Sequence, residues 1–390
     1  MTEKDSSANK RDMSATKNDI LASLSRRSVS RRGFLAGSAA VVFLAACGES
    51  EVGPSAQKKT TGGGVPTELE DELSIFNWAD YVNPKTYPMF EKELDIKITE
   101  DNYASNEDAL AKLQAGAKGY DVVVPTGYMI DTMIQEGILF ELDHDQIPNL
   151  ANVEDRFLDL PFDPGNKFSV PKDYGTTGYG YRSDLVSEEM TSWEDFFKLA
   201  PKYSGRYTVL NSPPEVVGAA LKMLGYSYNS TDANEISEAT DVLVKFKPHV
   251  RKITSSMREI MISGEAYISL TWNGEIGYVA LDAKDARYVV PAEGSEIWTD
   301  NWAIVAGAPH PAAAHAFLNW HLQPEVQALD TEYHYYGAVV EGEEEFLDPA
   351  LAKDPAVYPP DDVADKLEVA QASPDWLALR NEAWTKFKAA

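Results

Sequence analysis

The sequence of 390 residues is poor in cysteine and in long apolar runs. Cys47 is its only cysteine, so no disulfide can form within the chain. The apolar run over residues 34–46 is too short to span a bilayer as a helix, and no other long apolar segment follows it. We therefore expect a folded part that is stabilised by packing alone and that does not span a membrane.

Basic residues are also scarce, since 35 Lys and Arg stand against 62 Asp and Glu for a net charge of −27. Such a chain repels nucleic acid and attracts cations. An acidic surface that favours solubility, or that suits a salty habitat, would explain the same excess. The charge thus excludes a nucleic-acid partner but does not identify a ligand.

The cysteine closes an N-terminal segment that has the order of an export signal. A basic lead precedes the apolar core over 34–46, and small residues stand before Cys47. Residues 30–35, Ser-Arg-Arg-Gly-Phe-Leu, resemble a twin-arginine signal, and residues 44–47, Leu-Ala-Ala-Cys, resemble a bacterial lipobox. We expect residues 1–46 to be a signal peptide. Cys47 would then carry a lipid that anchors the exported protein to the outer face of the cytoplasmic membrane or within the periplasm.

Downstream of the cysteine, composition divides the chain into a tether and a folded part. Residues 47–70 are polar and glycine-rich, which is typical of a flexible coil. About 320 residues remain, more than one hydrophobic core usually supports, so two lobes are expected.

The beginning of the folded part alternates between strand and helix patterns. We predict strands over 73–79, 96–103 and 120–125, a helix over 83–94, and a second helix capped by Ser105 with Asp108. This order favours a mostly parallel sheet with helices on both faces. A second such region runs from about 178 to 298, with strands over 206–210 and 266–270 and a capping box of Thr191 and Glu194.

Aromatic and acidic residues gather just after the predicted strands, where ligands bind in open parallel sheets. They are Trp78, Asp80, Tyr81, Tyr128, Trp272, Trp298 and Asp300, and the hydroxyl residue Thr126 lies among them. Aromatic faces attract cations, and carboxylates accept charge-assisted hydrogen bonds from ammonium groups. Each aromatic alone is explained better by core packing, but the shared chemistry predicts a cage for an organic amine.

Several longer segments carry a family resemblance. They are Phe-Asn-Trp-Ala-Asp-Tyr-Val (76–82), Tyr-Asp-Val-Val-Val-Pro-Thr-Gly-Tyr (120–128), Leu-Pro-Phe-Asp-Pro (160–164), Leu-Gly-Tyr-Ser with Asn-Ser-Thr-Asp (224–232), Trp-Asn-Gly (272–274) and Trp-Thr-Asp (298–300). In this order they resemble the bacterial polyamine-binding proteins, the extracytoplasmic receptors of spermidine and putrescine transporters of the ABC type.

This resemblance implies a monomeric, non-enzymatic receptor of the α/β two-lobe periplasmic-binding-protein fold, with mostly parallel sheets, helices on both faces and a hinge. It also implies an ABC permease as the partner. Lobe 1 would comprise residues 71–177 and 300–344, and lobe 2 residues 178–299 and 345–390.

The resemblance also implies roles for single residues. Trp78, Tyr81 and Trp298 would flank the aliphatic chain of the amine. Asp80 and Asp300 would accept from ammonium groups, with Thr126 and Tyr128 as hydroxyl ligands. Trp272, Glu215 and Tyr336 would complete the site.

One departure from the family pattern concerns selectivity. The family has an aspartate where Ser212 stands and often an arginine at Pro214. A buried ammonium without a carboxylate costs several kcal/mol, so loss of an acid favours the dication putrescine over the trication spermidine. The segment after Tyr336 also lacks the proline-rich continuation of the family.

Other functions are less well supported by the sequence. The six histidines have no helical metal-pair spacing, and neither a metal nor a cofactor is expected. A tethered hydrolase would need a nucleophile with an oriented base, which the sequence does not provide. A ferric-iron receptor of the same fold that uses Tyr335 and Tyr336 is the main alternative. An anchored module that binds only another protein is a further one.

Overall fold

The structure, a computed structural model, describes residues 65–390. The predicted signal peptide, the lipidation site at Cys47 and the first part of the predicted tether lie outside the described residues. Glu68–Ala390 forms one compact unit. Within the described range, no helix has the length and apolar character needed to cross a membrane.

The first strands and helices follow the predicted alternation closely. Parallel strands β1 (Glu72–Trp78), β2 (Lys97–Tyr103) and β3 (Val122–Val123) are connected by α2 (Thr86–Leu94) and α3 (Asn106–Gln114), and α4 (Gly127–Gln135) follows. Ser105 caps α3 as predicted, since its hydroxyl accepts from the backbone N–H of Asp108 at 3.1 Å. Helix α2 begins at Thr86 instead of residue 83, because Asn83 forms a turn in which its side chain accepts from the N–H of Lys85.

Two long strands run through the centre of the sheet, and the sequence analysis did not predict their bounds. Strand β4 (Ser169–Arg182) pairs antiparallel with β9 (Ile297–Ile304) along residues 169–176. Along its remainder it pairs antiparallel with β7 (Ile268–Trp272) and β8 (Ala286–Val289). With β5 (Tyr207–Val209) and β6 (Val250–Ile253), the strand order is β2-β1-β3-β9-β4-β7-β5-β6, and β8 and β10 (Gly337–Ala338) also pair with β4. The α/β class and the two lobes are confirmed, but the sheet is mixed instead of mostly parallel. The reason is that β4 and β9 run against all their neighbours.

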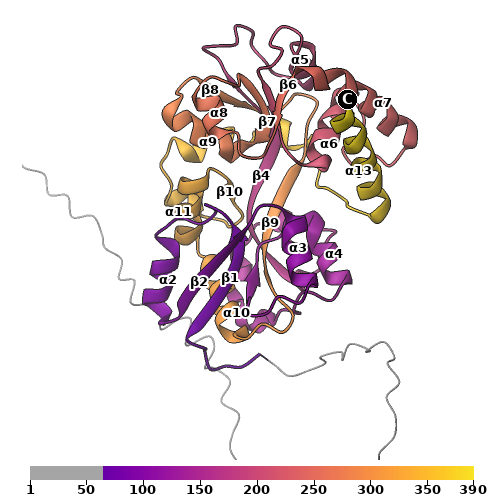
Figure 1. The fold of residues 1–390 in the computed structure, drawn as a ribbon. Helices are drawn as coiled ribbons and strands as arrows, with labels where there is room; N and C mark the ends of the chain where they lie inside the picture. Colours follow the sequence, from indigo (N-terminus) through magenta and orange to yellow (C-terminus); the bar gives the residue numbers. More distant parts are fainter. Residues whose placement is uncertain (1–64) are drawn as a thin grey trace, which may run out of the picture. The chain divides into compact units, whose positions relative to one another are not determined.

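The second half of β4 belongs to a second group of strands, which we call lobe 2; the β2-β1-β3-β9 group is lobe 1 (Figure 1). Lobe 2 contains β5 (Tyr207–Val209), β6 (Val250–Ile253), β7 (Ile268–Trp272) and β8 (Ala286–Val289), with α5 (Trp193–Lys198), α6 (Pro213–Met223), α7 (Ala233–Phe246), α8 (Arg258–Ile262) and α9 (Asn273–Asp282). The predicted cap of α5 is wrong by one residue. Ser192, not Thr191, accepts from the N–H of Asp195, because its backbone is extended at the helix entry.

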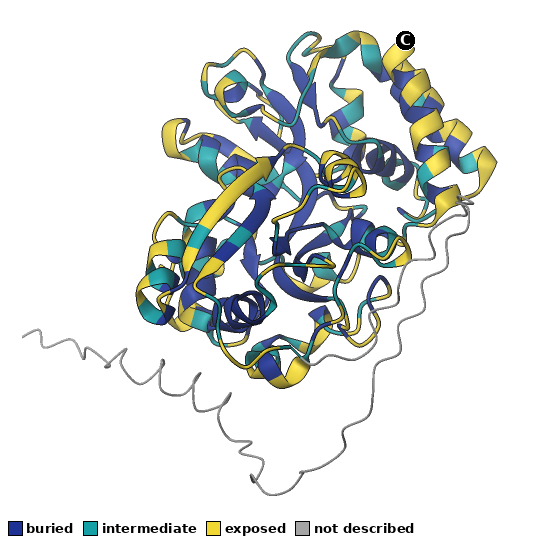
Figure 2. Ribbon diagram, turned by 60° about the horizontal axis from the view of Figure 1, so that its bottom comes forward, coloured by how far each residue is buried: buried dark blue, intermediate teal, exposed yellow. Residues whose placement is uncertain are grey.

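Helices enclose both sheets. In lobe 1, α3 and α4 pack on one face through Ala109, Leu113, Ile130 and Met133, while α2 and α10 (Pro311–His321) lie on the other side (Figure 1). The C-terminal part adds α11 (Pro324–His334), α12 (Asp361–Ala364) and α13 (Pro374–Ala389). Helix α13 buries one stripe against lobe 2 and leaves its other side exposed (Figure 2), whereas β2 forms a largely exposed edge of lobe 1.

Candidate ligand-binding site

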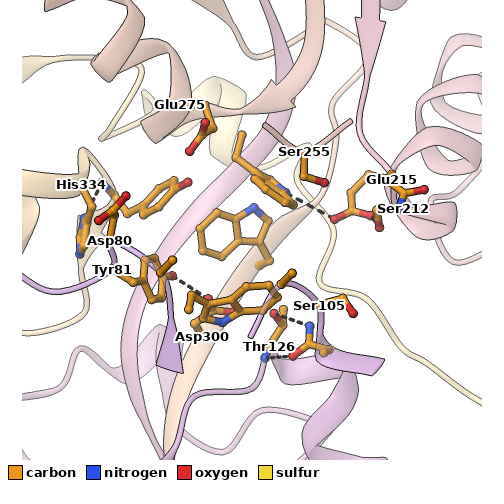
Figure 3. A pocket seen from close by; sticks show the side chains of 18 of the residues that line it. Asp80, Tyr81, Ser105, Thr126, Ser212, Glu215, Ser255, Glu275, Asp300 and His334 are labelled. Atoms are coloured by element: carbon orange, nitrogen blue, oxygen red, sulfur yellow. Dashed lines mark hydrogen bonds between the residues drawn. The ribbon is translucent and has the colours of Figure 1, made fainter. Parts of the chain in front are cut away.

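A cavity of about 950 Å³, including its open mouth, lies where the strand ends of the two lobes meet. All ten ligand-binding residues predicted from the sequence line it: Trp78, Asp80, Tyr81, Thr126, Tyr128, Glu215, Trp272, Trp298, Asp300 and Tyr336. Figure 3 shows Asp80 and His334 toward one end, Ser212 and Glu215 toward the other, and Asp300 between them. Residues more than 250 positions apart in sequence therefore share one cleft.

Asp300 is the central acid on the lobe 1 side. It lies in β9, paired in register with Asp173 of β4, and is 5% exposed. The hydroxyl of Tyr81 lies 2.6 Å from Asp300 Oδ2 and 2.8 Å from Asp173 Oδ1. The single hydroxyl hydrogen of Tyr81 can be donated to only one of these carboxylates at a time, so the close approach of the two acids favours a proton on one of them.

The surrounding charges decide which acid holds this proton. Burial raises the pKa of Asp173, but Lys172 and His334 outweigh it and hold that pKa below its usual range. Lys172 Nζ lies 2.5 Å from Asp173 Oδ2, and His334 Nε2 lies 3.2 Å from the same oxygen. Burial, with the charge of Asp173, raises the pKa of Asp300 to about 7. The ligand-free cleft thus keeps a proton on Asp300 near neutral pH, and an incoming ammonium would displace it.

Trp298 forms the aromatic floor of the cleft. It is 7% exposed and meets the ring of Tyr336 edge to face at 4.9 Å between ring centres. The indole lies directly against Gly175 of β4, where any β-carbon would collide with the ring. The glycine in this strand is therefore required by the close approach of the indole.

Thr126 and Tyr128 are held together at the start of α4. The side-chain amide of Asn106 donates to Thr126 Oγ1 and to the Tyr128 hydroxyl, each at 3.0 Å. Trp78 is fixed at the end of β1 by a hydrogen bond from its Nε1 to the carbonyl of Val124 at 2.9 Å. These contacts orient the lobe 1 wall without a ligand.

Lobe 2 contributes Glu215 from the first turn of α6. Pro213 and Pro214 occupy the first helical positions, where proline fits the backbone, and a carboxylate is favoured near a helix N-terminus. Ser212 stands at the N-cap position of this helix without a capping hydrogen bond from its side chain, and its hydroxyl instead donates to the Glu215 carboxylate. Burial, together with the charge of Glu296, raises the pKa of Glu215 well above its usual value. Ser212, which stands where the family pattern has an aspartate, therefore lines the cleft beside an acid that has no salt bridge among the described residues.

The cleft also contains charged residues that the sequence analysis missed. They are Glu107, Arg258, Glu275 and Glu296. Burial raises the pKa of Glu296 to about 7. Glu275 follows the Trp272-Asn-Gly segment by one residue, so the strand-end rule could have found it. Arg258 carries no such signal, because it lies in a five-residue helix.

The tyrosine pair of the iron alternative is divided between two cavities. Tyr336 lines the cleft, whereas Tyr335 lines a separate cavity beside Tyr288 and Val357. Tyr335 ends α11 in a left-handed conformation with φ of 60°, which separates the two rings. Across residues 65–390, no group of three or more His, Cys, Asp or Glu side chains is placed to hold a metal ion.

Taken together, buried acids line this cleft around an aromatic middle. Such a site suits an elongated, largely apolar molecule with positive charges along it.

Comparison with known proteins points to the same chemistry. Residues 85–360 match the model of the family described as bacterial extracellular solute-binding protein. The chain is 35% identical over 323 residues to the spermidine/putrescine-binding periplasmic protein of Salmonella typhimurium, covering 82% of this chain and 92% of that protein. It is 32% identical over 336 residues to the putrescine-binding periplasmic protein PotF of Escherichia coli, covering 81% and 91%.

A solved structure is similar in fold as well. The spermidine/putrescine ABC transporter substrate-binding protein PotD from Streptococcus pneumoniae superposes with a TM-score of 0.75 at 33% sequence identity. The match covers 82% of this chain and 99% of the other.

Proposed function

The chain belongs to the bacterial extracellular solute-binding proteins, and on that premise we propose that it binds a polyamine between its lobes and delivers it to an ABC permease. The ligand would be putrescine or spermidine. The protein would act as a receptor and not as an enzyme. It would bind its ligand as a monomer.

One observation carries this proposal: acids without a cation face the cleft from both lobes. Asp300 is 5% exposed and Glu215 is 9% exposed, and neither has a salt bridge among the described residues. Buried carboxylates without a partner are costly, and an ammonium group from a ligand would relieve that cost. The ring faces of Trp78, Trp272 and Trp298 would then contact the methylene chain and the cations.

The lobe boundaries predicted from the sequence, 71–177 with 300–344 and 178–299 with 345–390, remain part of the proposal. The passage of β4 between the lobes near Thr176 supports them, because its pairing changes there from β9 to β7. Closure about this crossing would bring Glu215 and Asp300 onto one ligand.

Calorimetric titration of the protein with putrescine, spermidine, spermine and ferric iron tests this function. Saturable binding of one of the amines, with no binding of iron, is expected. Iron binding with a visible phenolate colour, or no heat with any amine, would contradict it.

The proposed location is outside the cytoplasmic membrane, with Cys47 as the lipid-bearing residue. Cys47→Ser is expected to release the protein from the membrane fraction and to leave amine affinity unchanged, because the anchor is separate from the lobes. Cell fractionation and titration measure the two effects. A processed variant that stays membrane-bound would contradict lipidation at this residue.

A further inference from the structure

One acid in the cleft already has a cation. Glu275 is 8% exposed and accepts two hydrogen bonds from Arg258, from Nη2 to Oε1 at 2.6 Å and from Nε to Oε2 at 2.9 Å. Among the described residues, this is the one acid lining the cleft that takes part in a salt bridge. Arg258 and Glu275 both line the cleft, so the pair faces the ligand space.

The fold holds the guanidinium in place. Arg258 is the first residue of α8, Glu275 lies in the first turn of α9, and the two helices pack side by side. Tyr278, one turn after Glu275, presents its ring to the Arg258 guanidinium, whose Cζ lies 3.7 Å from the ring centre. A bidentate ion pair that also stacks on an aromatic ring is a rigid arrangement.

The pair lies near one end of the cleft. In the view of Figure 3, Glu275 lies toward the side of Asp80, and Glu215 lies on the opposite side. The electrostatics agree with this placement. Burial raises the pKa of Tyr278, and the charges of both Asp80 and Arg258 lie close enough to shift that pKa as well. An amine that extends from Glu215 past Asp300 would reach this end with its far ammonium.

We propose that Arg258 is a specificity-determining residue: its guanidinium occupies Glu275 and so withholds this carboxylate from the third ammonium of a triamine. This inference rests on the proposed function, since it concerns which amine the same cleft prefers. Asp300 and Glu215 remain available for the two ammonium groups of a short diamine.

The physical reason is that a cation next to a paired acid gains little. A third ammonium would meet a neutral ion pair whose outer charge is the positive guanidinium. It would lose water and find the solvent-exposed Asp80 as a partner in place of the buried Glu275, which is a weaker gain. A ligand with two ammonium groups and the length of putrescine avoids this end. Ser212 in place of an aspartate would also favour putrescine over spermidine. That effect would come from different residues, at the Glu215 end of the cleft.

The test compares putrescine and spermidine affinities, by calorimetric titration, in four forms of the protein. Arg258→Ala frees Glu275, Arg258→Lys keeps a cation there, and Arg258→Ala with Glu275→Gln removes both charges. Arg251→Ala is the matched control, because Arg251 pairs with Glu265 on the exposed surface away from the cleft. Thermal unfolding of each variant shows that it is folded.

Arg258→Ala is expected to raise spermidine affinity relative to putrescine by about tenfold or more, which corresponds to one newly available acid. Arg258→Lys, the double variant and Arg251→Ala are expected to keep the wild-type ratio. An unchanged ratio in folded Arg258→Ala, or the same gain in the double variant, would overturn the proposal. So would Arg258-dependent binding of an ω-amino acid, because the guanidinium would then be a carboxylate receptor. If the wild type binds neither putrescine nor spermidine, the proposed function itself is contradicted.

Discussion

Asp300 and Glu275 are both buried acids that face the same cleft, yet their surroundings differ. Asp300 lies in lobe 1, and the nearby cation Lys172 forms its salt bridge with Asp173 instead of with Asp300. Glu275 sits on lobe 2 with a guanidinium bound to both of its oxygens. Under our proposal, burial and position in a cleft do not by themselves make an acid a ligand site. What matters is whether the fold has already supplied the counter-charge.

Of the changes that test this comparison, loss of the Asp300 charge should have the largest effect on amine affinity. Asp300→Asn keeps the shape of the side chain but removes the acceptor's charge, so amine binding should weaken by about 2 to 5 kcal/mol. Titration calorimetry measures the change, and Asp101→Asn, an exposed acid on β2, is the control. Equal affinity of wild type and Asp300→Asn at both low and moderate salt would remove Asp300 from the site.

Removal of the aromatic floor should have the next largest effect. Trp298→Ala removes apolar contact and a cation–π face together, which should weaken amine binding by about 1 to 3 kcal/mol. Trp298→Phe, which keeps a ring, should lose less. If the alanine variant is folded and binds within about twofold of the wild type, Trp298 is a packing residue and the cage is misplaced.

Addition of an acid at the Glu215 end of the cleft should have a smaller effect, which is measured as the ratio of spermidine affinity to putrescine affinity. Ser212→Asp places a carboxylate beside Glu215 and should shift the preference several-fold toward spermidine, because a third ammonium then gains a partner. Ser212→Asn, similar in size but uncharged, should leave the ratio unchanged. Spermidine that binds the wild type more tightly than putrescine, with a ratio that Ser212→Asp does not alter, would contradict this account of selectivity.

The sequence predicted the cleft better than it predicted the sheet. Trp78 and Trp272 are the last residues of β1 and β7, and Thr126 comes shortly after β3, so the rule for strand ends brought them together correctly. Glu215 and Tyr336 came only from the family resemblance, since neither follows a predicted strand. The location of all ten side chains on one cavity agrees with both sources, while their part in binding stays a prediction.

Strand β4 shows why the rest could not be predicted. Its residues 169–182 are buried along almost their whole length and include Pro171, Lys172 and three glycines, so no alternating pattern marks a strand. Lys172 is accommodated only because Asp173 and the ring of Tyr81 surround it in three dimensions. Arg258 was missed for a related reason. Its partner lies 17 residues away on another helix, and only the packing of α8 on α9 joins them.

The proton on Asp300 gives the most direct test of the account. Because burial raises its pKa to about 7 in the ligand-free cleft, Asp300 retains this proton well above the pH at which an exposed carboxyl loses it. A bound ammonium favours the ionised carboxylate and lowers that pKa, so binding should release a proton. Amine affinity should accordingly rise as pH increases from 6 to 8.

Titration with putrescine at pH 7, in two buffers that differ in ionisation enthalpy, measures this release. We expect the observed heat to change with the buffer in the direction of proton release, and Asp300→Asn to reduce the difference. A heat that is the same in both buffers, with an affinity that does not rise from pH 6 to pH 8, would contradict the claim that this cleft holds an unpaired acid for a cationic ligand.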